Sequence, residues 1–538
     1  MHTKQWQTVC GFVTDICESV ASSERTMRDL FDLITEDKGK VIYSWYEGTR
    51  QAYIRRDAFR RSVISVARKL VDCLPDQHGI VGLHIDNDSF WPICYWAILM
   101  SGHVPLLLDS QYELFHYRTM NECSGIYCIT NDKNYPNIIS PDFIKNSHSE
   151  VDSAYFDQLW ANETIIVNEK NDGSLQAISH DGLSVSEQIL RLSRVYQYNL
   201  SMLYPSYMGP AKVSIFQSFS DYFSFLCGII LYPCFNYELY LPGENEDIQH
   251  YFTSSKALSV THHCISGKSC NEIIASVIKQ IKKTFPKDAT RYIAWLSGTE
   301  RINDYRILAK YMSMSSKIRK TVFGKKIRCM LCADNDLDSF ASHFFNQLGI
   351  FFGRGYWVPE LGLISMELSC EAEARAKNSV GILLKGVVGM LMEDGRLVLD
   401  CGDNIGQLIT SNGKEKIPSP FTIADKATFD QHNRLCILCN DQAVKPQKSQ
   451  ADPETIQKIR ELYATVLEKP LEIIEEDMDF FSALGGDSLS YFLLLQHIEL
   501  LYGIQIKPEE RIYFSTARYA AETLKPYIQE KGVVTKNA

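Results

Sequence analysis

The residues of this chain best suited to chemistry lie at 480–489. Two aromatic residues lead to Gly485 and Gly486, then to Asp487 and Ser488, and Ser488 opens an apolar helical pattern. A glycine pair permits a sharp turn and the close approach of a partner. The free N–H groups and the positive dipole end of a helix favour a phosphate held at its N-terminus. The Ser488 hydroxyl is therefore a candidate attachment point for a phosphate-linked group.

The elements that would position Ser488 are predicted to be helices. Asp452-Pro453 has the pattern of an N-cap followed by proline at the first helical position. Helical spacing continues over 456–467, and 516–528 can form a last helix. A plainer interpretation of Gly-Gly-Asp-Ser is a turn in which the serine caps a helix. The helix after Ser488 would have an apolar face of Tyr491, Leu494, Leu495, Ile498 and Tyr502.

This segment resembles the phosphopantetheine attachment site of peptidyl and acyl carrier proteins, whose pattern runs D-x-F-F-x-L-G-G-D-S-L. The resemblance implies a small four-helix carrier bundle at 453–530. In it, Ser488 would bear covalent 4'-phosphopantetheine taken from coenzyme A, with Gly486, Asp487 and Leu489 beside it. A phosphopantetheinyl transferase would attach the group, and the serine itself would perform no bond chemistry.

Composition bounds the rest of the chain. Its 538 residues, 45% of them hydrophobic, suffice for one large domain and a small one. A net charge of −10 argues against nucleic acid as the main partner. The longest apolar stretch, 222–235, is too short to span a membrane and contains Pro233. Without an export signal pattern, and with sixteen cysteines in so long a chain, we predict a reduced, cytoplasmic protein.

Two Cys-x-x-Cys pairs, at 329–332 and 436–439, allow a zinc interpretation. Both lie in apolar, strand-like runs, in which residues i and i+3 point to opposite faces of a sheet. A zinc knuckle needs a turn between its ligands, so we predict no metal there. Adjacent His262 and His263 cannot easily share an ion, and a core or solvated role is expected for them.

The first part of the chain alternates strand-like and helical patterns. Apolar strand-like runs at 41–45, 80–85 and 104–109 alternate with helical patterns at 57–70 and 91–100. Such alternation predicts an α/β domain with a largely parallel sheet.

This order of elements resembles the adenylate-forming superfamily, which includes acyl-CoA ligases and the adenylation domains of nonribosomal peptide synthetases. Residues 100–109 look like its "aGavyvPld" signature, and 124–130 look like the strand that follows. Residues 295–300 are similar to its "GGE" strand end, and 394–398 to the start of its later β-rich subdomain. The resemblance implies a large domain of layered sheets and helices over 1–443.

The motif that would hold nucleotide phosphates is changed. Adenylation needs a site that cradles phosphates, holds magnesium and neutralises developing charge. The family's loop T-S-G-S-T-G-x-P-K, aligned on Ser179-His180, corresponds here to 166–174. Neither position at which the loop has glycine is glycine in this stretch, and Ser174 stands where the lysine belongs. Glu169 and Asp172 in this stretch would repel a triphosphate.

Two acidic positions match the family's nucleotide motifs. Its Y-G-x-T-E reads 356–360 here, with Glu360 kept and Trp357 in place of the glycine. Its ribose-binding T-G-D reads 423–425 and keeps only Asp425. We expect Glu360 and Asp425 to be structural or surface acids, and relics of a nucleotide site are the alternative.

The family's mobile C-terminal subdomain, which delivers a catalytic lysine, has no counterpart in this sequence. A polar linker at 444–452 leads straight into the carrier bundle at 453–530, which is followed by a tail at 531–538. We therefore predict a degenerate, truncated adenylation-like domain fused to a carrier domain.

Three functions follow. The first is a carrier component of a nonribosomal peptide or related specialised-metabolite assembly system, with an acyl or aminoacyl thioester on the arm of Ser488. A separate loading ligase or acyltransferase would load it, condensation or tailoring enzymes would act on it, and the large domain would be a pseudoenzyme used as a docking platform.

The second function is a divergent adenylating enzyme that loads its own carrier, for which Glu360, Asp425 and His180 are the support. The third is an interaction protein in which the serine stays unmodified. The cargo is open, although Asp221 is a candidate for the acid that grips an α-amino group.

Overall fold

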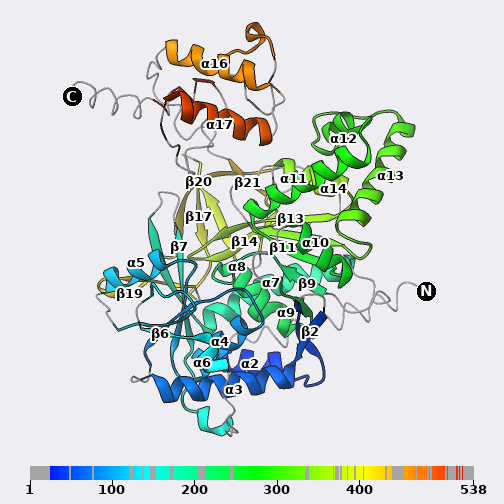
Figure 1. The fold of residues 1–538 in the computed structure, drawn as a ribbon. Helices are drawn as coiled ribbons and strands as arrows, with labels where there is room; N and C mark the ends of the chain where they lie inside the picture. Colours follow the sequence, from blue (N-terminus) through cyan, green and yellow to red (C-terminus); the bar gives the residue numbers. More distant parts are fainter. Residues whose placement is uncertain are drawn as a thin grey trace, which may run out of the picture. The chain divides into compact units, whose positions relative to one another are not determined.

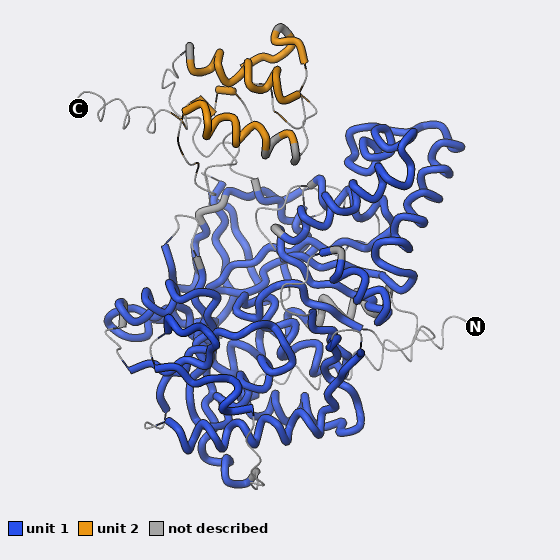
Figure 2. Tube along the Cα trace, in the orientation of Figure 1, with its two compact units in different colours: residues 1–439 blue, residues 440–538 orange. Residues whose placement is uncertain are grey.

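The computed structural model falls into two compact units, residues 1–439 and 440–538 (Figure 2). The residues that the structure describes are 25–47, 50–74, 78–121, 125–135, 137–145, 153–169, 174–203, 212–242, 248–333, 339–367, 369, 375, 379–384, 386–392, 395–403, 405–430, 433–438, 453–467, 469–476, 478, 480, 484, 488–502, 504, 506, 517–518, 520–521 and 524.

One sheet of the large unit has eight strands in the order β19-β18-β8-β7-β4-β3-β5-β6. The strands from β7 to β6 in this order run parallel, while β8, β18 and β19 add antiparallel pairs. The strands are β3 (Ile80–His84), β4 (Val104–Leu107), β5 (Tyr127–Thr130), β6 (Ile138–Ile139), β7 (Glu163–Glu169), β8 (Leu175–Asp181), β18 (Gln407–Thr410) and β19 (Gly413–Lys416).

The second sheet has nine strands in the order β15-β14-β13-β12-β11-β9-β10-β1-β2, parallel from β13 to β1. They are β1 (Val41–Glu47), β2 (Arg50–Arg55), β9 (Lys212–Ile215), β10 (Glu238–Tyr240), β11 (His262–Ile265), β12 (Cys329–Ala333), β13 (Phe351–Val358), β14 (Gly362–Met366) and β15 (Ile382–Leu383). Both sheets are largely parallel with antiparallel edges, as the alternation of patterns predicted.

A smaller antiparallel sheet of four strands accounts for the predicted β-rich part. It consists of β16 (Val388–Leu391), β17 (Arg396–Asp400), β20 (Phe421–Phe429) and β21 (Leu435–Leu438).

Helices cover the two large sheets (Figure 1). The predicted helix at 57–70 is part of α3, and its apolar residues are buried because they pack on the main core; they are Phe59, Val63, Val66, Ala67 and Leu70. Every residue of α4 is buried, which explains its uninterrupted apolar sequence. The helices are α2 (Met27–Thr35), α3 (Arg56–Cys73), α4 (Phe90–Met100), α5 (Gln111–Asn121), α6 (Pro141–Lys145), η1 (Ser153–Phe156), α7 (Gly182–Leu203), α8 (Tyr222–Phe225), the π-helix η3 (Leu226–Leu231), α9 (Tyr232–Cys234), α10 (Ile248–Ala257), α11 (Gly267–Thr284), α12 (Ala289–Leu296), α13 (Tyr305–Val322) and α14 (Ser339–Gln347).

Residues 295–300 correct the prediction of a strand end. They lie at the end of α12 and in the turn after it, not in a strand. The reason is the spacing of the buried residues Ala289, Tyr292, Trp295 and Leu296, which share one helical face. A short apolar run does not by itself distinguish a helix from a strand.

The first Cys-x-x-Cys pair lies in a strand, as predicted. Cys329 belongs to the main core and Cys332 to a second core formed with α10–α14, so the two thiols lie on opposite faces of β12. His262 and His263 are buried in the neighbouring strand β11. Cys436 lies in β21, whereas Cys439 is outside the described residues. Within the described part of the chain, no helix is long and apolar enough to cross a membrane.

The small unit contains α16 (Pro453–Leu467), the 3-10 turn η4 (Leu471–Ile473) and α17 (Ser488–Tyr502). Residues 517, 518, 520, 521 and 524 are also helical, as the helix predicted over 516–528 requires, and Ala517, Ala520, Ala521 and Leu524 are buried. A four-helix bundle over 453–530 stays a prediction.

Candidate functional site

Ser488 is the first residue of α17, where the sequence places it. The helix is held by Leu494, Leu495 and Ile498, which are buried against α16. Ser488 therefore stands at the positive end of the dipole of α17. The side chains of Ser488 and Leu489, and all of Gly486 and Asp487, are outside the described part of the structure.

Residues of the same motif anchor the chain just before Ser488. Phe480 is fully buried, and its ring meets Tyr463 edge-on at 5.0 Å. Leu484 is also buried, and its carbonyl accepts a hydrogen bond from the Lys469 ammonium. Arg518 forms an ion pair with Glu476 in the acidic approach to the motif. The aromatic and acidic positions thus fix the approach to the serine.

Helix α17 also carries uncovered apolar side chains. Leu493, Leu500 and Leu501 are exposed, to 80% at Leu500. Leu493 lies off the apolar face predicted for this helix, which leaves it as apolar surface near the serine.

Glu360, which matches the glutamate of the family's Y-G-x-T-E motif, follows β13. Its Oε1 accepts a hydrogen bond of 2.9 Å from Gln176 Nε2 on β8. The Glu360 carboxylate therefore makes a hydrogen bond within the protein itself. Asp425 lies in β20 of the small sheet, and its side chain is not described.

Aromatic side chains from β8, α8 and β13 pack on one another. The ring of His180, at the end of β8, stacks on Tyr222 with centroids 4.1 Å apart. Trp357 on β13 meets Tyr222 edge-on at 5.2 Å and Phe223 at 5.6 Å. Burial lowers the pKa of His180 to about 3. Its Nδ1 lies 3.0 Å from Ser184 Oγ, while its Nε2 is buried with no hydrogen-bond partner in the described structure.

The stretch aligned with the phosphate loop is part of a β-hairpin. Strand β7 continues to Glu169, which pairs with Leu175 at the start of β8. Asp172 lies outside the described residues. Asp221, the candidate partner of an amino group, instead caps α8, where its Oδ1 accepts from Ser224 N at 2.8 Å.

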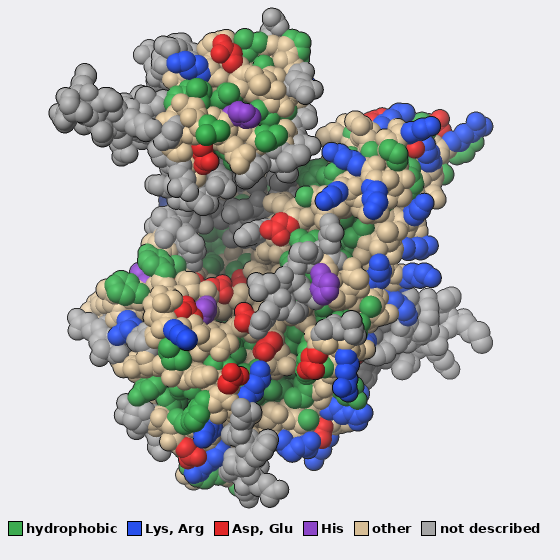
Figure 3. Space-filling view, viewed as in Figure 1, with side chains coloured by type: hydrophobic (Ala, Val, Ile, Leu, Met, Phe, Trp, Pro, Cys, Tyr) green, Lys and Arg blue, Asp and Glu red, His purple; other side chains and the backbone are tan. Residues whose placement is uncertain are grey.

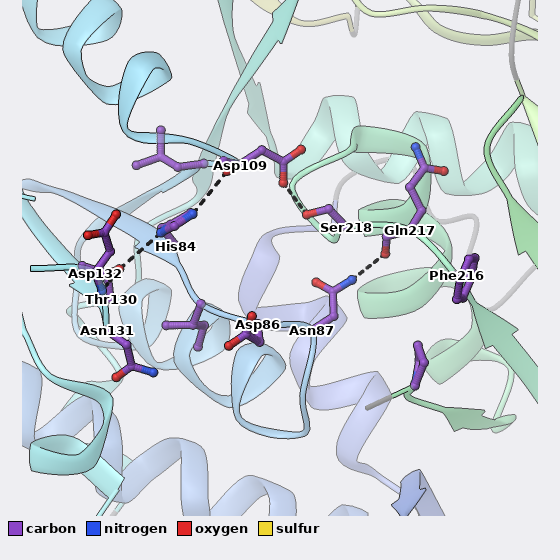
Figure 4. Close-up of a pocket in the computed structure, with 13 residues that line it drawn as sticks. His84, Asp86, Asn87, Asp109, Thr130, Asn131, Asp132, Phe216, Gln217 and Ser218 are labelled. Carbon is purple, nitrogen blue, oxygen red and sulfur yellow. Dashed lines mark hydrogen bonds between the residues drawn. The ribbon is translucent and has the colours of Figure 1, made fainter. Parts of the chain in front are cut away.

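A cleft of about 640 Å³ in the large unit was not anticipated from the sequence (Figure 4). Its walls are the segments that follow β3, β4 and β5 of the eight-stranded sheet and β9 and β10 of the nine-stranded sheet. The lining residues are His84, Ile85, Asp86, Asn87, Leu108, Asp109, Thr130, Asn131, Asp132, Phe216, Gln217, Ser218 and Pro242. The one feature of the sequence that could have indicated this cleft is the pair of predicted strand ends at 85 and 109, because parallel strands end at a common edge of the sheet.

Hydrogen bonds join the two sheets at the floor of this cleft. Asn87 Nδ2 donates to the Gln217 carbonyl at 2.5 Å, and Ser218 Oγ donates to Asp109 Oδ1 at 2.5 Å. The ring of His84 lies between Thr130 Oγ1 and the Asp109 carbonyl, 3.2 Å from each. The cleft is therefore held in shape by the protein itself (Figure 4).

The small unit resembles known carrier proteins in sequence. Residues 457–518 match the family model of the phosphopantetheine attachment site. The chain is also 30% identical over 83 residues to acyl carrier protein 4, chloroplastic, of Cuphea lanceolata, a match that covers 15% of this chain and 60% of that protein. Residues 457–518 are a carrier domain, and its cofactor is covalently bound 4'-phosphopantetheine.

The large unit resembles adenylate-forming enzymes in fold. The Klebsiella oxytoca NpsA N-terminal subdomain in complex with 3-hydroxybenzoyl-AMSN superposes with a TM-score of 0.53 at 13% identity, over 77% of this chain and 100% of that chain. Bacillus subtilis o-succinylbenzoate coenzyme A synthetase (MenE) in complex with AMP gives 0.53 at 12% identity, over 76% and 78%. A single-residue variant of Escherichia coli MenE with bound OSB-AMS gives 0.51 at 11%, over 75% and 77%. At such identities the likeness shows the fold alone, which for the large unit is that of an adenylate-forming-like domain. The carrier domain at 457–518 is fused to it.

Proposed function

We propose that this chain is a carrier component of a nonribosomal peptide or related specialised-metabolite assembly system. Its phosphopantetheine arm is attached to Ser488 and holds an acyl or aminoacyl group as a thioester. The observation that carries the proposal is the attachment-site match over 457–518, within which Ser488 begins α17. A phosphopantetheinyl transferase acting on coenzyme A supplies the arm.

The large unit, in this proposal, is a docking platform that no longer adenylates. Support comes from the side chains around Glu360. Trp357 stands where the family keeps a glycine for close approach, and it packs on Tyr222 and Phe223. Gln176 occupies an oxygen of Glu360 that magnesium would need. A nucleotide would have to displace these contacts.

The absence of a second subdomain between the two units also supports loss of adenylation. Only residues 439–452 separate β21 from α16. The similarity extends over the whole NpsA N-terminal subdomain but leaves about a fifth of the MenE chain unmatched. The stretch between the two units therefore does not supply the lysine that such a subdomain delivers.

The proposal therefore needs partner enzymes. A separate ligase or acyltransferase loads the thiol, and condensation or tailoring enzymes act on the tethered group. The exposed Leu493, Leu500 and Leu501 of α17 give these enzymes an apolar face to bind.

The alternative is a divergent adenylating enzyme that loads its own carrier. The retention of Glu360 and His180 favours it, since both lie near the end of β8 and β13 in the counterpart of the nucleotide site. A pyrophosphate-exchange assay with ATP, magnesium and a panel of amino and aryl acids separates the two functions. The docking role predicts no exchange above a heat-treated sample, and acid-dependent exchange would establish the alternative.

A further inference from the structure

We propose that the cleft between the two large sheets binds a small organic cation, an amine or guanidine without acidic groups. The site lies wholly within the large unit. It goes beyond the carrier function and does not depend on it.

The position of the cleft is the first argument. Within the eight-stranded sheet, β3 lies between β4 and β5, so the chain passes to one side of β3 and then to the other. Within the nine-stranded sheet, β9 lies between β10 and β11 in the same way. Ligands of open parallel sheets bind outside the carboxyl ends of strands at such points of reversal. Here the reversal points of both sheets contribute to one cleft of about 640 Å³, a volume typical of small-molecule sites.

The charge of the lining selects the ligand. Three carboxylates, from Asp86, Asp109 and Asp132, line the cleft, and no lysine or arginine is among its described lining residues. A phosphate or carboxylate placed there would be repelled by the three carboxylates, with His84 as the one other titratable side chain among the described lining residues, whereas a cation would be attracted. The ligand is therefore cationic and has no acidic group of its own.

The carboxylates retain oxygens for a ligand. Asp109 uses Oδ1 to accept from Ser218, and Asp132 uses Oδ1 to accept from Asn134. The exposed carboxylate of Asp86 makes no hydrogen bond within the described structure. An ammonium or guanidinium group presents several N–H donors, which suits acceptors that come from separate loops.

An organic cation fits better than a metal ion. No group of three or more His, Cys, Asp or Glu residues in the described part of the chain is arranged to hold a metal. Ile85, Leu108, Phe216 and Pro242 add apolar walls, and the face of Phe216 can also attract a cation. The class of ligand is thus an amine with an aliphatic or aromatic body.

The test uses the full chain and isothermal titration with 2-phenylethylamine, putrescine and agmatine. Phenylacetate and magnesium chloride, each alone, are the comparison ligands. We expect saturable binding of at least one amine that weakens with added salt, and no binding of phenylacetate. Asp86→Asn and Asp109→Asn should each weaken the amine about two- to fivefold, as for exposed ion pairs.

Asp403→Asn is the matched control, because Asp403 is an exposed aspartate that pairs with Lys416 outside the cleft. It should leave the affinity unchanged. Failure of all three amines to bind, tighter binding of phenylacetate or magnesium, or equal affinities in the wild type and both cleft variants would each overturn the proposal. A circular dichroism spectrum equal to wild type confirms that the isosteric variants fold.

Discussion

At the scale of single residues, Ser488 carries the function that we propose. It is the hydroxyl at the start of α17, and the buried Phe480 and Leu484 fix the chain that leads to it. Ser490 lies two residues further along the same helix and provides a close comparison.

Substitution of Ser488 is expected to abolish attachment of the arm. With fluorescent coenzyme A and a broad-specificity phosphopantetheinyl transferase, Ser488→Ala should stay unlabelled in a denaturing gel, because the phosphate has no oxygen to bond. Ser490→Ala should label like wild type. Label retained in Ser488→Ala would place the attachment elsewhere.

Trp357 is expected to be a core residue rather than one wall of an open site. It is 8% exposed and contacts two aromatic rings. Trp357→Ala should lower the free energy of unfolding by about 3–5 kcal/mol, measured by urea denaturation, through lost burial and a cavity. Tyr305→Ala, at a side chain that is 72% exposed, should change it by about 0.5 kcal/mol or less. A neutral Trp357→Ala would indicate that a nucleotide pocket is still open there.

At the scale of elements, β8 and β11 bury histidines in their neutral form. Burial lowers the pKa of His180 to about 3 and that of His263 to about 3. Burial, with a contribution from Arg328, lowers the pKa of His262 to about 4. In the unfolded chain these imidazoles take up protons near pH 6.5, so protonation favours unfolding.

Stability should therefore be complete above pH 6.5 and fall as the pH drops toward 4. Each histidine contributes about 1.4 kcal/mol per pH unit in this window. The free energy of unfolding, measured in urea at pH 7.5 and 5.5, should show this loss. His180→Gln should reduce the difference between the two free energies of unfolding by the contribution of one histidine. His250→Gln should leave the difference unchanged, because His250 is exposed. An unchanged difference in His180→Gln would mean that His180 is protonated in the fold.

An element could be predicted when the residue pattern that determines it lies within one short segment of the sequence. The face of α3 could be read from the sequence because its apolar residues recur at helical spacing. The strands at 80–85 and 104–109 were bounded by clear changes in polarity. The end of α12 was misread because residues 295–300 were compared with a family motif, whereas the helical spacing that decides the structure runs from Ala289 to Leu296.

The cleft could not be predicted, because it depends on how two sheets meet. Asn87 and Gln217 are 130 positions apart in the sequence, yet they share a hydrogen bond at its floor. Ser488 could be predicted because its whole motif lies within eleven consecutive residues.

At the scale of the whole molecule, charge is distributed unevenly. Residues 267–328 contain fifteen Lys and Arg against four Asp and Glu, a net charge of +11 within a chain of −10. Most of these basic side chains are exposed, and they gather over α11–α14 (Figure 3). A protein of this net charge would not ordinarily bind a negatively charged resin.

We expect the full chain to be retained on a sulfonate cation exchanger at pH 7 and low salt. The combined variant Lys279→Glu, Lys282→Glu and Lys283→Glu should elute at clearly lower salt, because these exposed residues of α11 belong to the basic segment. The same number of Lys→Glu changes at Lys38, Lys40 and Lys414 should shift elution less. Equal shifts in the two variants would show that net charge alone decides retention.

The central claim is that this chain carries a group on Ser488 but cannot activate that group itself. Intact-mass spectrometry of the phosphopantetheinylated full chain, after incubation with ATP, magnesium and mixed amino and aryl acids, tests it most directly. The account predicts the mass of the chain plus one phosphopantetheine group and nothing more. A further ATP-dependent gain equal to one acyl or aminoacyl group would contradict it.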